Sequence, residues 1–311
     1  LSTSPFLWVN AKPLTVFFGT SGRGSEGIYQ ATFNPENGKF PPAKLAAKIG
    51  SPGFLALHPN GKILYSVGRW EDGSGALGYH ISKNGELEEF TRMICPDGGS
   101  AHIAVHPSGK FLLTAQYGGG SVALFPLDSS GKLGEPTVTE HQGGSKVVDR
   151  RQDSPHPHWT GFSPDGNYAL IPDLGLDQIV IYKVHSSKPA ITPHGVGQSV
   201  PGGGPRHMRF SSDGRFIYLL NELSLSVTTF AWDVQKGTAK ALSTTPAISQ
   251  EVKAGESFNS AAEILAHPSG SFVYSSNRGH DTVSVYRTNL KSGRLKVIQV
   301  QPIRGAFPRN I

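Results

Sequence analysis

The chain has 311 residues, of which 37% are hydrophobic, with 38 glycines and 23 prolines, a composition that excludes disorder and suits many short strands and turns. No apolar run reaches the about 18 residues of a transmembrane helix, so we expect no membrane association. The net charge of +6 comes from scattered Lys and Arg residues, which argues against nucleic acid and favours a small anionic partner.

Residues 15–18 and 27–33 predict two strands with no inner strand ahead of them. Five copies of a short turn phrase follow, centred on Gly61, Gly109, Gly166, Gly214 and Gly270. These glycines are separated by 48, 57, 48 and 56 residues, and a repeat of about 50 residues indicates a propeller or another repeat array. Apolar runs on both sides of each glycine predict two strands joined by a tight hairpin.

A third apolar run and a weaker outer run follow each hairpin, which makes four antiparallel strands, the number in one propeller blade. The five complete units occupy residues 51–95, 98–142, 155–200, 202–250 and 259–304. No apolar periodicity of helical length accompanies them. We therefore predict an all-β propeller of four-stranded antiparallel blades, forming a single domain over residues 1–311.

Residues 307–311 look like the start of another inner strand, where the sequence ends. In one interpretation, this segment pairs with residues 15–18 and closes a ring of six blades. In the other, the sequence covers about six blades and the start of a further one. A later strand would then complete a seventh blade beside residues 15–18.

The single cysteine, Cys95, excludes an intramolecular disulfide, which is usual in a reducing compartment. The sequence begins at residues 1–5 without a methionine and without the pattern of a signal peptide. We favour a cytoplasmic location, with export after removal of an N-terminal signal as the alternative. A monomer or a weak oligomer is expected.

The turn glycines set a register in which equivalent strand ends can be compared. Positions eight residues before and eight after each glycine lie at the same end of a hairpin, which in a propeller opens onto the central channel. At these positions and their neighbours the blades do not agree, and polar side chains appear. They are Arg69, His102, Gln116, Tyr117, His158, Asp173, Arg206, His207, Asn221, Glu222, Glu263, Asn277 and Arg278. We expect several to converge on one cavity, although for any single residue a solvent-facing strand end is the alternative.

His156 and His158 are two residues apart, so on a strand they face the same side and could hold a metal. No carboxylate at matching register accompanies them, and proton transfer by His158 is the sharper hypothesis. Arg206 follows a glycine-rich loop and suits a carboxylate or phosphate group. Glu222 falls near this arginine, where a structural ion pair is the alternative to a catalytic role.

Several phrases resemble the lactonase family of seven-bladed β-propellers, in the same order and over essentially the whole chain. They lie at residues 155–158, 172–177, 204–207, 221–223, 262–264, 276–279 and 307–310. This family includes 6-phosphogluconolactonases and carboxy-cis,cis-muconate lactonizing enzymes. The resemblance implies a central set of His158, Arg206, Glu222 and Arg278. It also favours the seven-bladed interpretation over a closed ring of six blades.

We predict a lactonase that hydrolyses a sugar-acid lactone, most readily 6-phosphogluconolactone, without a metal or other cofactor. His158 or Glu222 would activate water, while Arg206 and Arg278 would hold the substrate's phosphate or carboxylate and stabilise developing negative charge. The predicted contacts to substrate hydroxyls or anionic groups are Gln116, Asp173, His207, Asn221, Asn277 and Arg309.

Three alternatives stay open. The same groups acting on a muconate-type carboxylate would make a lactonizing cycloisomerase. A non-catalytic propeller used as an interaction platform would carry an apolar, aromatic-rich patch on one face. A metal-dependent lactonase would lose its activity in the presence of a chelator.

Overall fold

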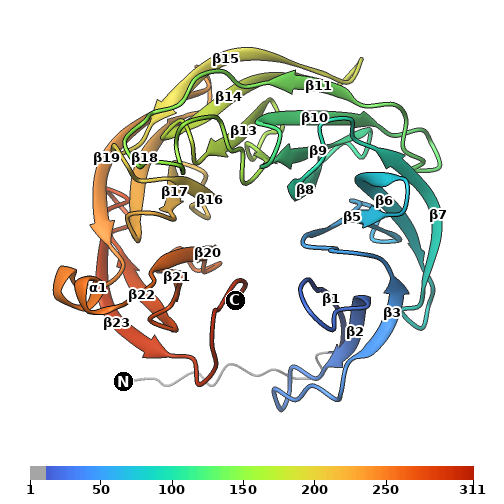
Figure 1. Cartoon of the computed structure of the whole chain (residues 1–311), viewed down its shortest axis with the longest axis horizontal. Helices are drawn as coiled ribbons and strands as arrows, with labels where there is room; N and C mark the ends of the chain where they lie inside the picture. Colours follow the sequence, from blue (N-terminus) through green and yellow to red (C-terminus); the bar gives the residue numbers. More distant parts are fainter. Residues whose placement is uncertain (1–11) are drawn as a thin grey trace.

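The computed structural model describes residues 12–311, which form six antiparallel β-sheets arranged around a central axis (Figure 1). The first sheet has three strands, β1 (Leu14–Gly19), β2 (Gly27–Phe33) and β3 (Lys44–Lys48). Each of the other five has four strands, which confirms the predicted propeller of four-stranded blades. Residues 1–5, on which the expectation of a removed leader depends, lie outside the described residues.

All strands of the five complete sheets fall within the units predicted from the turn phrases. The second sheet contains β4 (Leu55–Leu57), β5 (Ile63–Trp70), β6 (Gly73–Ile81) and β7 (Leu87–Ile94). The third contains β8 (Ser100–Val105), β9 (Phe111–Gln116), β10 (Ser121–Pro126) and β11 (Thr137–Glu140). The fourth contains β12 (Gly161–Phe162), β13 (Tyr168–Asp173), β14 (Gln178–His185) and β15 (Ala190–Gln198). The fifth contains β16 (Pro205–Phe210), β17 (Phe216–Asn221), β18 (Ser226–Asp233) and β19 (Thr238–Pro246). The sixth contains β20 (Ser260–Ala266), β21 (Phe272–Arg278), β22 (Thr282–Thr288) and β23 (Leu295–Pro302).

The five turn glycines share one backbone conformation, with φ angles between 69° and 74°. In each hairpin the glycine N–H donates to the carbonyl three residues earlier, as Gly109 does to His106 at 2.8 Å. A tight turn followed by a left-handed residue needs glycine at this point, because a side chain is strained there. The register inferred from the turn phrases is therefore the register of the blades.

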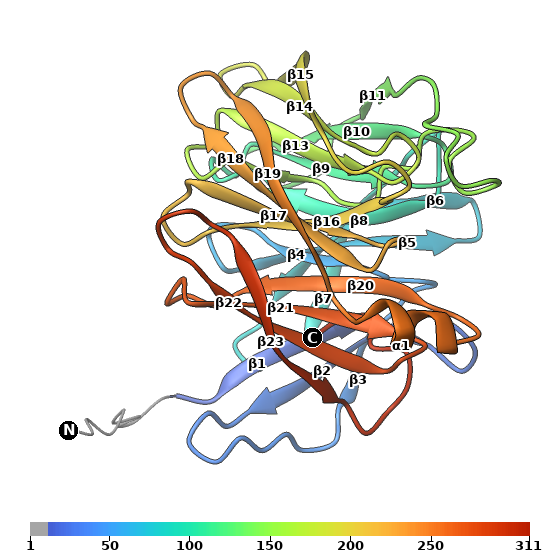
Figure 2. The same cartoon turned by 90° about the vertical axis from the view of Figure 1, so that its left-hand side faces the viewer.

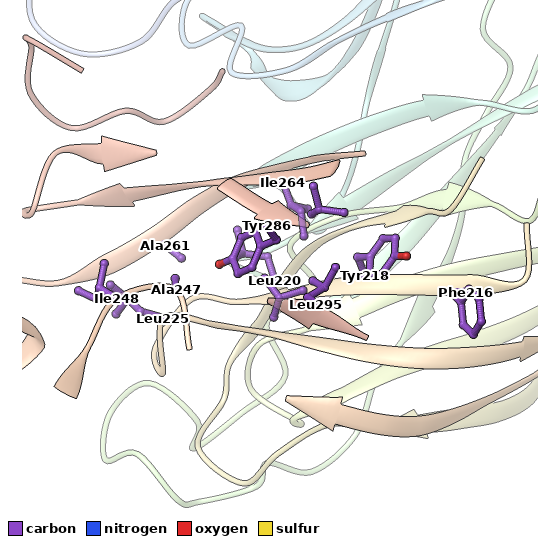
Figure 3. Close-up of a cluster of buried hydrophobic side chains, with 12 residues drawn as sticks. Phe216, Tyr218, Leu220, Leu225, Ala247, Ile248, Ala261, Ile264, Tyr286 and Leu295 are labelled. Atoms are coloured by element: carbon purple, nitrogen blue, oxygen red, sulfur yellow. The ribbon is translucent and has the colours of Figure 1, made fainter. Parts of the chain in front are cut away.

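The hydrophobic core lies between neighbouring sheets. In the cluster shown in Figure 3, Tyr218 and Leu220 of β17 pack with Ile264 and Tyr286 of the sixth sheet. Four further clusters join the other consecutive pairs, from the first and second sheets to the fourth and fifth. None of the clusters found within residues 12–311 joins the sixth sheet to the first.

Residues 307–311 form no strand and do not pair with β1 in the structure described. The N–H of Phe307 donates to Asp281 Oδ1 at 2.8 Å. The ring of Phe307 stacks on that of Phe258, with the two ring centroids 5.6 Å apart. Asn310 Nδ2 donates to Glu263 Oε2 at 3.0 Å. The end of the chain is thus held by the sixth sheet and reaches the centre of the ring (Figure 1).

One short helix, α1 (Gln250–Gly255), links the fifth and sixth sheets (Figure 2). The hydroxyl of Ser249 caps it by accepting from the N–H of Val252, and no helix residue is buried. This explains why no helical periodicity is visible in the sequence. Over residues 12–311, no helix has the length and apolar character needed to cross a bilayer.

Candidate active site

A cavity of about 540 Å³ opens where the hairpin ends meet at the central channel. Most positions eight residues from a turn glycine line it, as the register predicts. They are Gly53, Ala101, His158 and Arg206 before the glycines, and Tyr117, Glu222 and Arg278 after them. His207, Arg309 and Asn310 complete the polar part of the wall.

Glu222 is the centre of an ion-pair cluster in this cavity. Its Oε2 accepts from Arg206 Nε at 2.8 Å and lies 3.3 Å from Arg278 Nη2. Its Oε1 accepts from Arg151 Nη2 at 2.8 Å. His158 Nε2 is 3.8 Å from Oε2, so residues 64 positions apart in the sequence meet at one site.

The cavity is strongly cationic. Arg206, Arg278 and Arg309 line it and Arg151 sits at its edge, whereas Glu222 is the one carboxylate in the wall formed by the described residues. Burial of Arg206 lowers the pKa of its guanidinium to about 10, which leaves it charged at neutral pH. The excess positive charge makes this cavity suited to an anionic ligand.

Glu222 is ionised despite being only 6% exposed. Burial by itself would raise its pKa, but the positive charges of His158, Arg206 and Arg278 outweigh burial and lower the pKa to about 2. At neutral pH the arginines supply this stabilisation, because the pKa of His158 is itself low. Such a weakly basic carboxylate is a poor acceptor for a proton from water.

His158 lies just ahead of β12, although the register places it at the end of a predicted strand. Pro157 has no N–H to donate to a ladder, so only an isolated bridge to Asp173 forms there. The N–H of His158 still donates to Pro172 O at 3.0 Å, which fixes the residue at the cavity. Burial, with the nearby charge of Arg206, lowers the pKa of His158 well below its usual range, so the imidazole is neutral.

Arg206 and His207 both line the cavity although they are adjacent on a strand. Alternation would place one of them on the opposite face. A β-bulge between Pro205 and His207 inserts Arg206 as an extra residue and breaks the alternation. Comparable bulges fall between Ser100 and His102 and between Ala261 and Ile264.

The residues seven positions after the turn glycines lie behind the cavity wall. Asn221 and Asn277 are fully buried, and each Nδ2 donates to two hydroxyl groups of its own sheet, on Ser226 and Thr228 for Asn221. The predicted substrate contacts of these two amides are therefore not supported by their placement. Their hydrogen bonds instead tie together the ends of neighbouring strands.

Asp173 and Gln116 are also fully buried and hydrogen-bonded to protein. Asp173 Oδ1 accepts from the N–H groups of His156 and Gly175 at 2.8 and 2.9 Å, and its Oδ2 is 2.7 Å from His141 Nδ1. Gln116 Nε2 donates to a hydroxyl oxygen of its own strand at 2.6 Å. Neither residue is placed where it could contact a ligand in the cavity.

His156 does not share a ligand position with His158. Its Nδ1 is 2.8 Å from the backbone carbonyl oxygen of Tyr117. Its ring stacks on that of Tyr117, with the two ring centroids 4.7 Å apart. Across residues 12–311, no three His, Cys, Asp or Glu side chains form a set that could hold a metal ion.

Arg151 is the residue that the repeat register misses. It belongs to the loop between β11 and β12, outside the hairpins, so it has no equivalent position in the other blades. Its side chain is 40% exposed and reaches Glu222 from the rim. The Arg150-Arg151 pair in a loop rich in polar residues is the one signal in the sequence that could have marked it.

Comparison with known proteins agrees with this architecture. Residues 15–311 match the family described as Lactonase, 7-bladed beta-propeller. The chain is 34% identical over 288 residues to a 6-phosphogluconolactonase of Bacillus subtilis (strain 168), covering 92% of this chain and 81% of that protein.

Solved structures are similar over the same extent. A protein from Lactobacillus plantarum superimposes with a TM-score of 0.89 at 29% identity, covering 96% of this chain and 85% of that one. The periplasmic gluconolactonase PpgL of Pseudomonas aeruginosa gives a TM-score of 0.83 at 29% identity, with the same coverage. The chain described here belongs to the lactonase family of seven-bladed β-propellers.

Proposed function

We propose that this protein hydrolyses a sugar-acid lactone that carries an anionic group, with 6-phosphogluconolactone as the substrate. The observation that carries the proposal is the cluster of Arg151, Arg206, Arg278 and Arg309 around a cavity wall to which residues 12–311 contribute one carboxylate, Glu222. A phosphate group would neutralise this excess positive charge. The name of the Bacillus subtilis relative supports the same substrate.

In the proposed reaction, His158 is the general base. Its neutral imidazole takes a proton from a water molecule while the water oxygen forms a bond to the lactone carbonyl carbon. Glu222, 3.8 Å away, stabilises the imidazolium that results. This assignment follows from the contacts of Glu222, because three arginines occupy its two oxygens, whereas the neutral imidazole of His158 lines the cavity.

The same step places negative charge on the former carbonyl oxygen, where Arg206 or Arg278 stabilises it. The bond between the carbonyl carbon and the ring oxygen then breaks, and the imidazolium of His158 returns its proton to the leaving oxygen. One lactone and one water thus give one carboxylic acid and one hydroxyl group, and the acid ionises at neutral pH. All residues return to their starting protonation states.

The proposal is tested by initial hydrolysis rates of the purified protein, measured above the spontaneous rate with and without a chelator. We expect 6-phosphogluconolactone to give a kcat/KM at least about tenfold above that of the lactone without phosphate, the value of one charge-assisted hydrogen bond. Equal values for the two lactones would overturn the role of the arginines. Loss of activity with the chelator would favour the metal-dependent alternative.

A carboxy-muconate in the same panel separates hydrolysis from lactonizing cycloisomerisation, since the cavity would bind either anion. Formation of a lactone from the muconate, without hydrolysis of any sugar-acid lactone, would support the cycloisomerase. A folded protein that is inactive on the whole panel would support the interaction platform.

A further inference from the structure

A buried chain of polar side chains runs from Glu263 to the cavity. Glu263 is only 1% exposed, and each of its side-chain hydrogen bonds comes from a donor group. Its Oε1 accepts from His207 Nδ1 at 3.1 Å, Arg209 Nη2 at 3.1 Å and the N–H of Ile264 at 2.9 Å. Its Oε2 accepts from Asn310 Nδ2 at 3.0 Å. Glu263 therefore acts as an acceptor through both oxygens.

This arrangement determines which nitrogen of His207 carries the proton. A carboxylate oxygen can only accept, so Nδ1 of His207 must be the donor in the contact with Glu263. A neutral imidazole then presents a lone pair on Nε2. That nitrogen lies 3.2 Å from Arg206 Nη1, where it accepts the guanidinium hydrogen. Burial and the neighbouring Arg206 charge lower the pKa of His207 well below its usual range, in agreement with a neutral ring.

Arg206 is consequently held from three sides. Its Nε donates to Glu222, and its Nη1 donates to both His207 Nε2 and the backbone carbonyl of Ala262. Within the described part of the chain, Nη2 makes no hydrogen bond to protein. The guanidinium of Arg206 is thus fixed by protein acceptors at Nε and Nη1 and keeps Nη2 for a ligand.

We propose that Glu263 and His207 are positioning residues that hold Arg206 in the orientation required by the lactone. This inference rests on the proposed lactonase function for its kinetic part only. If Glu263 is neutralised, His207 is free to protonate Nε2 instead of Nδ1. An N–H would then face the N–H of Arg206 Nη1, and the guanidinium would turn away from its present orientation.

The test compares variants that preserve or remove the acceptor for Arg206. His207→Gln keeps one donor and one acceptor end in the side chain, whereas His207→Phe keeps the ring shape and removes both. We expect kcat/KM to fall about tenfold or more in His207→Phe, the cost of a lost hydrogen bond to a charged group. We expect the fall in His207→Gln to stay within about threefold, as for a partly rescued hydrogen bond.

Glu263→Gln removes the carboxylate that selects the tautomer, and Arg209→Gln is its matched control. Arg209 donates to the same oxygen of Glu263 and makes no hydrogen bond to Arg206 in the structure of residues 12–311, so its loss leaves the link from Glu263 to Arg206 in place. We expect kcat/KM to fall about tenfold in Glu263→Gln and less than threefold in Arg209→Gln. Melting temperatures confirm that each variant is folded.

Two measurements do not depend on the lactone. The ¹⁵N chemical shifts of labelled His207 should report a proton on Nδ1 in the unmodified protein and a mixture of tautomers in Glu263→Gln. Calorimetry with inorganic phosphate should show weaker binding in His207→Phe than in His207→Gln. A proton on Nε2 in the unmodified protein, or equal phosphate affinity in the two folded His207 variants, would overturn the inference even if lactone hydrolysis is confirmed.

Discussion

The two halves of the cavity wall differ in charge although they come from the same repeat. The fourth, fifth and sixth sheets supply the cationic half of the wall, with His158, Arg206, Glu222 and Arg278. The second and third sheets supply the neutral half, with Gly53, Phe54, Ser100, Ala101 and Tyr117. Eight residues before the turn glycine, Gly53 and Ala101 occupy the positions that are equivalent to His158 and Arg206. A ligand with one anionic end therefore has one preferred orientation, with its uncharged part against the second and third sheets.

The largest effect is expected from the proposed general base. His158→Asn should lower kcat by about 10²–10⁴-fold, the usual contribution of a general base, and Glu222→Gln should lower it because the imidazolium loses its partner. His185→Asn is the matched control, since this exposed histidine lies at the end of β14 in the same sheet as His158. Full activity in a folded His158→Asn variant would show that His158 is not the general base.

Arg278→Gln should give the next largest effect. Loss of a cation that faces developing negative charge costs about 10²–10³-fold in kcat, comparable to removal of an oxyanion-hole donor. Arg287→Gln, on the exposed side of β22 in the same sheet, should leave kcat/KM unchanged. If both substitutions reduce kcat/KM equally, the effect arises from the net charge of the protein and not from the cavity.

Glu222 should also make stability depend on pH. Its pKa is about 2 in the folded protein, below the ordinary value of 4.5, so its stabilising contribution is present above pH 4.5 and is lost as the pH falls toward 2. Between pH 6 and pH 3 we expect the free energy of unfolding to fall by about 2 kcal/mol more in the unmodified protein than in Glu222→Gln. Urea titrations of both proteins at pH 6 and pH 3 measure this difference, and parallel losses would contradict the predicted pKa.

Ionic strength should weaken binding of the phosphorylated lactone more than that of its uncharged counterpart. Raising salt from about 0.01 M to 0.1 M shortens the screening length from about 30 Å to 10 Å, so the field of the arginines reaches less far. The KM for 6-phosphogluconolactone should rise severalfold, and the KM for the uncharged lactone should stay nearly constant. The same change for both substrates would show that the cationic half does not attract the phosphate.

The smallest effect is expected in the neutral half. Tyr117→Phe keeps the ring that packs on His156 and His158, at 4.7 and 5.2 Å, and removes only the hydroxyl. We expect kcat/KM to change by less than about threefold, since a neutral hydrogen bond contributes about 1 kcal/mol or less. A larger loss would mean that the neutral half takes part in the chemistry.

The repeat and its register follow from the sequence alone because they depend on local preferences. Each turn glycine is needed for a left-handed backbone conformation, which Gly61 and Gly270 adopt like the other three. Once the hairpins are placed, the ends of their strands must meet near the axis. The register therefore places His158, Arg206, Glu222 and Arg278 among the strand ends near the axis, and the resemblance to the lactonase family singles out these four.

Only the tertiary structure decides which of the neighbouring polar residues face that cavity. Glu222 lines it and Asn221 is buried behind it, a choice set by the face of β17 that packs against the next sheet. A bulge places both Arg206 and His207 on the cavity side, and a loop between blades brings Arg151 to Glu222. These outcomes depend on contacts between segments far apart in the chain, which turn signals and strand alternation do not encode.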